Sequence, residues 1–135
     1  MKNQLSSLGP LERRIMETLW GEPVREREFT VRDVLIKFEG RPAYTTLMTT
    51  LDRLFKKGFL GRRTEGRAFV YSVRVAKGEF LRNVARDIID RFAGHQTEEA
   101  LLACLVEVVS QRDRELLNEL EHLVKMKRRE QREAD

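Results

Sequence analysis

Four threonines stand close together in one predicted helix near the middle of this 135-residue chain. The stretch Tyr44–Lys57 has helical periodicity, yet Thr45, Thr46, Thr49 and Thr50 all fall in its first half. Threonine is a poor helix former because its β-branch loses side-chain freedom and its hydroxyl competes for backbone hydrogen bonds. The same short side chain can bind nucleic acid. Its hydroxyl can bond to a phosphate or a base edge, and its methyl group can contact a thymine methyl.

A helical wheel separates this predicted helix into an apolar side and an outer side. The apolar side, expected to pack on two preceding helices, consists of Tyr44, Leu47, Leu51, Leu54 and Phe55. The outer side consists of Thr45, Thr49, Arg53 and Lys56, with Thr46 and Asp52 at its margins. In a simpler interpretation, Thr45 caps the helix and the other threonines are indifferent surface choices. One threonine is enough for a cap, however, and each further one costs up to about 0.7 kcal/mol relative to alanine. We therefore favour contact with a DNA groove.

Three predicted helices and a hairpin would position this outer side. Apolar periodicity predicts a first helix over Pro10–Trp20, a short second helix capped by Thr30, and the threonine-rich third helix, which Gly58 ends. Alternating apolar residues then predict strands at about Leu60–Arg63 and Ala68–Val73, joined by a four-residue turn. This order is that of a winged helix-turn-helix domain, in which the N-terminal part of the second helix of the motif enters the major groove.

Basic side chains surround the predicted third helix. Arg41 precedes it, Arg62 and Arg63 lie on the first strand of the hairpin, and Arg67 is at the hairpin tip. An arginine at such a tip suits a phosphate or a narrow minor groove. The candidate DNA-binding residues are Arg41, Thr45, Thr46, Thr49, Arg53, Lys56, Arg62, Arg63 and Arg67. The alternative is a winged-helix protein–protein interaction module, but the core of a protein interface tends to be depleted in charge.

The charge is unevenly distributed along the chain. Residues 1–74 contain 15 Lys/Arg and 9 Asp/Glu, a net charge of +6, whereas residues 75–135 contain 11 and 13, a net charge of −2. Positive charge gathered in one half indicates either an anionic partner or a solvated basic face. We predict a winged helix-turn-helix DNA-binding domain over residues 1–75 and a helical dimerisation region over residues 76–135.

The second region is predicted to be entirely helical. Apolar stripes indicate one helix that ends at Gly94, another that begins at Thr97, and a third over Asp113–Arg129. The middle helix is apolar almost all round, and such a helix must be buried. We favour burial in a homodimer over burial in a monomeric bundle. The candidate dimerisation residues are Phe80, Val84, Ile88, Leu101, Leu105, Leu116, Leu120 and Leu123.

Several classes of function are not indicated. The chain has no Ser/His/Asp set, glycine-rich phosphate loop or metal-ligand spacing, so we predict no enzyme, no cofactor and no metal site. Cys104 lies in a helix that we expect to be buried, which favours a small core residue over a nucleophile. The longest apolar run, Ala100–Val106, is much shorter than the ~20 residues that span a bilayer. The N-terminus lacks the apolar core of a signal peptide, so we expect a cytoplasmic protein without membrane insertion.

Three stretches resemble those of a known family. The segments LGPLERRIMETLW, YTTLMTTLDRLFKKGFL and GRAFVYSV are similar to the BlaI/MecI (penicillinase repressor) family, and the middle segment is the most specific. The resemblance implies a mainly α fold with a small β-hairpin wing and a C-terminal helical dimerisation arm. It implies a homodimeric transcriptional repressor of a palindromic operator in double-stranded DNA, with Thr45, Thr46, Thr49 and Arg53 on the recognition helix and Arg67 on the wing.

The resemblance also implies a mode of induction. In β-lactam-responsive members a membrane sensor controls a protease that cleaves an Asn-Phe bond in the C-terminal region. Cys104 and Leu105 stand at that place here, so the expected cleavage site is not matched. Copper-responsive members use paired cysteines near the C-terminus, and this chain has one cysteine. We therefore do not expect that form of metal sensing.

Overall fold

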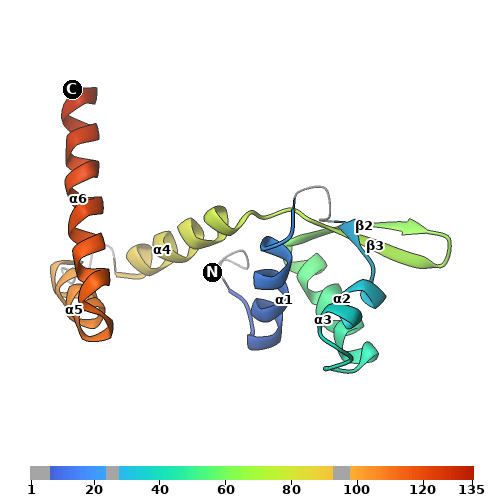
Figure 1. The fold of residues 1–135 in the computed structure, drawn as a ribbon. Helices are drawn as coiled ribbons and strands as arrows, with labels where there is room; N and C mark the ends of the chain where they lie inside the picture. The colour runs from blue at the N-terminus through green and yellow to red at the C-terminus, as the bar shows by residue number, and fades with distance from the viewer. Residues whose placement is uncertain (1–6, 24–27, 93–97) are drawn as a thin grey trace. The chain divides into compact units, whose positions relative to one another are not determined.

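Six helices and three short strands make up the part of the chain that the computed structural model describes, residues 7–23, 28–92 and 98–135 (Figure 1). They occur in the order α1 (Pro10–Trp20), β1 (Glu28–Phe29), α2 (Val31–Lys37), α3 (Tyr44–Lys57), β2 (Leu60–Glu65), β3 (Ala68–Val73), α4 (Lys77–Phe92), α5 (Glu98–Arg112) and α6 (Arg114–Ala134). The predicted bounds of α1 and α3 are confirmed, and the fold is mainly α with a small antiparallel sheet.

Local signals explain where the helices of the motif begin and end. The hydroxyl of Thr30 accepts a hydrogen bond from Asp33 N at 3.2 Å, and the carboxylate of Asp33 accepts one from Thr30 N at 2.9 Å, which completes a capping box at α2. Gly58 ends α3 in the left-handed region, at φ 92°. Phe59 N then donates to Leu54 O at 3.0 Å, so the chain turns sharply from α3 into the sheet.

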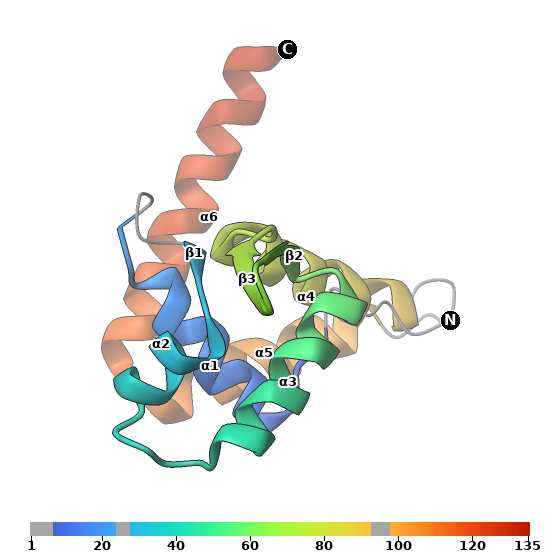
Figure 2. The same ribbon diagram turned by 90° about the vertical axis from the view of Figure 1, so that its right-hand side faces the viewer.

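The sheet has the order β1-β3-β2 and is antiparallel throughout (Figure 2). The sequence did not predict the two-residue strand β1, which pairs with β3 just before Thr30 caps the second helix. The wing hairpin also differs from the prediction, because β2 continues to Glu65 and leaves a turn of two residues, Gly66 and Arg67. Gly66 has φ 61°, as the first position of such a tight turn requires.

The core of the winged part lies between the three helices and one face of the sheet. Its fully buried side chains are Ile15, Met16, Leu19, Val34, Leu47, Leu51, Leu54, Phe59, Leu60 and Tyr71. The expected apolar side of α3 is thus confirmed at Leu47, Leu51 and Leu54, whereas Tyr44 is 45% exposed and does not pack on α1 and α2 as predicted. Tyr44 is the first residue of α3 and lies near the wing.

The chain divides into two compact units, Met1–Ile88 and Ile89–Asp135. The start of α4 belongs to the first unit because Phe80 lies in its core, 7% exposed, with its ring 5.5 Å from Trp20 and 5.7 Å from Phe59 between centroids. Trp20 Nε1 also donates to Val75 O at 2.8 Å. The first unit thus includes most of α4, as far as Ile88, which we had expected to belong to the dimerisation region. The predicted division between residues 75 and 76 stays a prediction.

The second unit contains α5 and α6, and neither helix has a buried residue. Cys104, expected to be buried, is exposed on α5. Asp113 caps α6 by accepting a hydrogen bond from Glu115 N at 2.9 Å, and α6 runs past the predicted end at Arg129. Gly94 and Thr97, predicted to end one helix and begin the next, lie outside the described residues. Among the helices described, none is long and apolar enough to cross a membrane.

Candidate nucleic-acid interface

The outer face of α3 carries small hydroxyl side chains and a cation, Arg53, that forms no ion pair with the residues the structure describes. Thr45, Thr46, Thr49 and Arg53 are exposed, and together with Thr50 they line a shallow surface hollow of about 290 Å³. The N-cap of α3 is Ala43, and no side chain forms a cap hydrogen bond there. The interpretation of Thr45 as a cap is therefore wrong, which leaves the exposed threonines without a role in starting the helix.

Hydrogen bonds within α3 orient two of these hydroxyls. Thr49 Oγ1 donates to Thr45 O at 3.0 Å, and Thr50 Oγ1 donates to Thr46 O at 2.7 Å. Each bond uses the hydroxyl hydrogen and leaves the oxygen lone pairs free to accept. Thr49 presents its oxygen and methyl group at the surface, whereas Thr50 is only 6% exposed and faces the core. Thr49 can thus meet an external donor, and Thr50 cannot.

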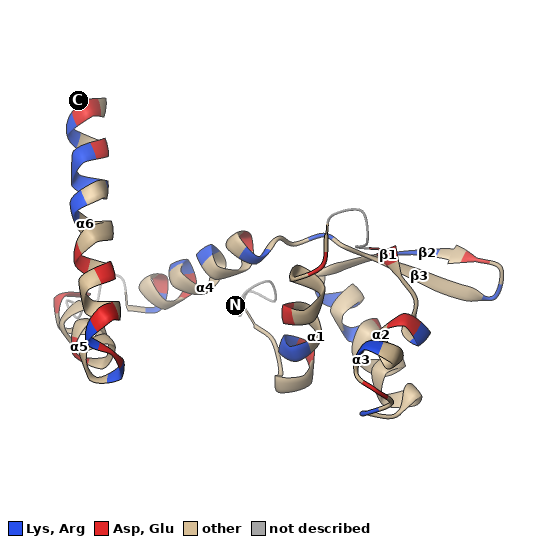
Figure 3. Cartoon of the chain, viewed as in Figure 1, with Lys and Arg blue, Asp and Glu red and all other residues tan. Residues whose placement is uncertain are grey.

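Three of the predicted arginines are available to an anionic partner. Arg41 precedes α3, Arg53 lies on its outer face, and Arg67 occupies the wing tip, where the ribbon in Figure 3 is blue for Lys and Arg. All three are exposed, and none forms an ion pair with a described residue. The predicted docking surface therefore has free cations before, on and beside the helix.

Arg62 is held inside the domain instead of facing outward. Its guanidinium lies 4.0 Å from the ring centroid of Phe55 and 4.1 Å from that of Phe69, between the two rings. Nη1 also donates to Asp52 Oδ1 at 2.8 Å. These contacts join β2 and β3 to the last turns of α3. Arg62 is thus half-buried, with 21% of its side chain exposed, whereas Arg53 and Arg67 are exposed. Its role as a DNA contact stays a prediction.

Lys56 shares the same carboxylate. Lys56 Nζ lies 2.9 Å from Asp52 Oδ2, one helical turn away, but its side chain is 70% exposed and can still reach a phosphate. The hydrogen bonds from Lys56 and Arg62 lower the pKa of the Asp52 carboxyl below its ordinary value of 3.8. Asp52 therefore stays ionised and reduces the net positive charge at this end of α3.

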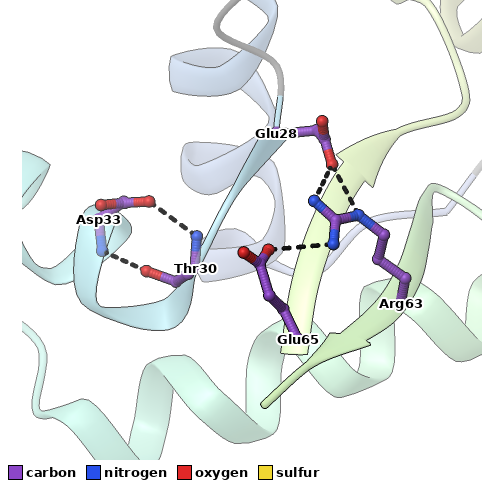
Figure 4. A network of polar contacts seen from close by, with 5 residues as sticks. All are labelled: Glu28, Thr30, Asp33, Arg63 and Glu65. Carbon is purple, nitrogen blue, oxygen red and sulfur yellow. Dashed lines mark hydrogen bonds and ion pairs between the residues drawn. The ribbon is translucent and has the colours of Figure 1, made fainter. Parts of the chain in front are cut away.

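Arg63 belongs to an ion-pair network on the other face of the sheet (Figure 4). It donates from Nε to Glu28 Oε1 and from Nη1 to Glu65 Oε2, both at 3.0 Å. Arg63 pairs with Val70 across the strands, one residue out of step with Arg62, so strand alternation turns it away from α3. The network ties the wing to β1, and a DNA phosphate would have to compete with two carboxylates for Arg63.

An open trough between the wing and the start of α3 was not foreseen. It has a volume of about 500 Å³. Its lining residues are Thr30, Val31, Arg32, Tyr44, Met48, Arg67, Ala68, Phe69 and Tyr71. The sequence signal for it was weak. Met48 follows Tyr44 by one helical turn, and both lie beside the threonine face. They form one side of the trough only because residues of the wing form the other side, and the sequence does not show that placement.

The predicted dimerisation residues fall into two groups. Phe80 is buried in the first unit and Val84 is half-buried against its core, so both serve the fold of their own chain. Ile88, Leu105, Leu116 and Leu123 are exposed, and Leu101 and Leu120 are half-buried. Within the described part of the chain, no three His, Cys, Asp or Glu side chains gather as metal ligands would.

Known proteins of similar sequence point to one family. Residues 8–124 match the family model of the penicillinase repressor. The chain is 33% identical over 108 residues to the transcriptional regulator BlaI of Mycobacterium tuberculosis (strain ATCC 25618 / H37Rv). The aligned segment covers 78% of this chain and 76% of that protein. It is 33% identical over 61 residues to an uncharacterized 16.5 kDa protein of Latilactobacillus sakei, covering 45% of this chain and 42% of the other. A solution structure of the DNA binding domain of the repressor BlaI superposes with a TM-score of 0.46 and 24% identity, over 58% of this chain and 93% of that one.

Proposed function

The chain belongs to the penicillinase repressor family, and we propose that it acts as a homodimer on a palindromic operator in double-stranded DNA. The family consists of transcriptional repressors, so the chain is a DNA-binding repressor and not an enzyme. The proposal adds the oligomeric state, the symmetry of the operator, and the residues that touch it. It also keeps the division into a DNA-binding domain over residues 1–75 and a dimerisation region over residues 76–135.

The outer face of α3, the recognition helix in this proposal, is the observation that carries the assignment. Thr45, Thr46 and Thr49 are small enough to let the helix backbone approach the base pairs, and each has a hydroxyl oxygen and a methyl group for base edges. Arg53 extends from the same face toward a phosphate or a guanine. Arg67 at the wing tip then reaches the neighbouring minor groove or its phosphates. A face of this composition suits DNA better than it suits the charge-depleted core of a protein interface.

The helices of the second unit support the homodimer. Along α5 and α6, Leu102, Leu105, Val108, Leu116 and Leu123 are each 41–55% exposed. Monomeric proteins seldom expose contiguous apolar surface of this kind, and a second copy of the same helices is the simplest cover. A two-fold dimer presents two recognition helices related by symmetry, so its preferred operator consists of two inverted half-sites.

Induction by cleavage between Cys104 and Leu105, the position of the Asn-Phe bond in β-lactam-responsive members, would require α5 to unwind. Cys104 and Leu105 lie in the middle of α5, well inside its bounds of Glu98–Arg112. A protease needs an extended segment, so the helix would have to unwind before this bond could be cut. We therefore include no membrane sensor or protease in the proposed mechanism.

Fluorescence anisotropy with the DNA upstream of the protein's own gene tests the proposal. The upstream duplex and a random duplex of equal length are compared at two salt concentrations. We expect tighter binding to the upstream duplex, and binding to both should weaken with salt because Lys and Arg displace counterions from phosphate. Arg53→Ala should weaken binding. Arg13→Ala is the matched control, since Arg13 is an exposed arginine on α1 without an ion pair in the described structure.

Two results would contradict the proposal. If the wild-type chain binds the upstream and random duplexes equally and weakly, the operator assignment is wrong and a protein partner becomes the better candidate for α3. If Arg53→Ala and Arg13→Ala bind alike, the docking face of α3 is wrong even where operator binding is intact.

A further inference from the structure

The trough beside α3 is lined by both apolar and cationic side chains. Tyr44 and Met48 on α3 are each 45% exposed and Phe69 on β3 is 43% exposed, and all three line it. Large apolar side chains are seldom left exposed together on a docking surface without a partner. The occupant of the trough should therefore have apolar surface of its own.

Arg32 of α2 and Arg67 of the wing tip also line this trough. Both are exposed, and neither forms an ion pair with any residue in the described ranges. Lining residues with acidic side chains are absent from this part of the structure. The occupant should thus carry negative charge next to its apolar part.

The geometry of a winged helix predicts which part of the DNA lies here. A helix in the major groove and a hairpin in the adjacent minor groove are separated by the backbone of one strand. On α3, Tyr44 and Met48 lie on the flank that faces the wing, next to the outer positions Thr45 and Thr49. A strand between helix and wing must pass over that flank.

We propose that the trough binds the sugar–phosphate backbone of one DNA strand, an inference that rests on the proposed function. A DNA strand alternates an apolar deoxyribose with an anionic phosphate, which is the alternation that the trough matches. The deoxyribose lies against Met48 and Phe69, and the flanking phosphates are bound by Arg32 and Arg67. Arg32, Tyr44 and Met48 thereby become DNA contacts beyond the recognition face and the wing tip.

Binding of a random-sequence duplex tests the trough, because a backbone contact does not depend on sequence. The association constant is measured by anisotropy over a series of KCl concentrations for the wild type, Arg32→Ala and Met48→Ala. The plot of log K against log[KCl] has a negative slope, and Arg32→Ala should make this slope less steep by about 0.9 for each chain bound. Met48→Ala should weaken binding by about three- to tenfold without changing the slope, since it removes apolar contact only. Arg13→Ala is again the control, and thermal unfolding confirms that each variant is folded.

Chemical modification of tyrosine gives a second, independent readout. The chain has two tyrosines, of which Tyr44 is exposed in the trough and Tyr71 is buried at 1% exposure. Tetranitromethane should therefore nitrate Tyr44 in the free protein. A saturating random duplex should protect Tyr44 when the peptides are quantified by mass spectrometry, whereas Tyr71 should stay unmodified in both samples.

The outcomes separate this inference from the proposed function. If the wild type binds duplex and Arg53→Ala weakens binding, but Arg32→Ala and Met48→Ala bind like the wild type, the trough proposal is overturned and the repressor assignment stands. Nitration of Tyr44 that continues in the bound complex overturns it as well. If the wild type binds no duplex, the proposed function fails and the trough proposal fails with it.

Discussion

Arg62 Nη1 donates to Asp52 Oδ1 at 2.8 Å, and through this bond the wing is attached to the C-terminal half of α3. The guanidinium lies between the rings of Phe55 and Phe69, so one side chain contacts α3 and both strands of the hairpin. The separation of wing and recognition helix determines whether both can reach the DNA together. We therefore expect Arg62 to position the wing for DNA binding and not to bind a phosphate itself.

Replacing Arg62 should affect stability and DNA binding in a different way from replacing Arg67. Arg62→Met keeps an unbranched side chain between the rings but loses the cation–π contacts and the bond to Asp52, so we expect the free energy of unfolding to fall by about 1–2 kcal/mol. DNA affinity should fall with no change in salt slope. Arg67→Ala should leave stability unchanged and lower the slope by about 0.9 per chain. Urea unfolding and anisotropy measure both, and a reduced slope for Arg62→Met would show that it contacts phosphate after all.

The ion pairs of Asp52 should contribute less to the free energy of unfolding at acid pH, where the Asp52 carboxylate becomes protonated. Hydrogen bonds from Lys56 and Arg62 lower the pKa of Asp52 in the folded chain from 3.8. A lowered pKa stabilises the fold fully above the unfolded value and loses that effect as pH falls through the folded value. Wild type and Asp52→Asn should thus differ by a constant amount from about pH 5 to 7. The difference should shrink below pH 3.8, as urea unfolding at each pH would show. A constant difference throughout the acid range would contradict the assignment.

Thr49 and Thr50 offer a matched pair for testing direct readout. Thr49→Val keeps the shape and the methyl group but removes the exposed oxygen, so affinity for the upstream duplex should fall by about 1–3 kcal/mol if a base donates to it. Affinity for random duplex should not change. Thr50→Val removes the hydroxyl of a core-facing threonine, and we expect it to alter the unfolding temperature without altering the ratio of specific to random affinity. Equal losses on both duplexes for Thr49→Val would mean that the Thr49 hydroxyl leaves Thr45 O and donates to a phosphate instead of accepting from a base.

Local signals explain why the sequence could predict the elements of the winged domain. The capping pair of Thr30 and Asp33, the apolar period of α3 and the left-handed Gly58 each act within a few residues. They do not depend on how the rest of the chain folds. The strand β1 has two residues and no period to detect, because it exists only where Glu28 and Phe29 meet β3.

The candidate site was harder to predict because side-chain pairing depends on distant residues. A sequence shows that Arg62, Arg63 and Arg67 are cations, but their availability differs. Arg62 is held by rings from two elements, and Arg63 is held by Glu28, which lies 35 positions away. The wheel placed Tyr44 on the side that packs on the preceding helices, but Tyr44 is 45% exposed and lines the trough beside the wing, an element that a wheel does not include. Free and paired cations can be told apart only once the strands are in register.

Phe80 should prove to be a core residue of its own chain. It lies against Trp20 and Phe59 at 7% exposure, so Phe80→Ala should lower the free energy of unfolding by about 3 kcal/mol. Ile88 is 38% exposed on the same helix, and Ile88→Ala should cost much less in a monomer. Thermal unfolding at low protein concentration compares the two variants. If Phe80→Ala changes the dimer dissociation constant but not the stability of the winged domain, its original prediction as a dimer contact is the better one.

Charged substitutions on α5 and α6 should separate the proposed dimer. Leu105 and Leu116 are 41% and 48% exposed, and a second copy would bury them. Because an aspartate buried there without a partner is strongly unfavourable, Leu105→Asp and Leu116→Asp should shift the chain from dimer to monomer in sedimentation equilibrium. Lys127→Ala, at an exposed position of α6, is the control. The monomeric variants should keep the winged fold yet bind the upstream duplex far more weakly, because the second half-site is no longer bound by a linked domain. A monomeric wild type, or dimers that survive both substitutions, would mean that something other than a second copy covers these helices.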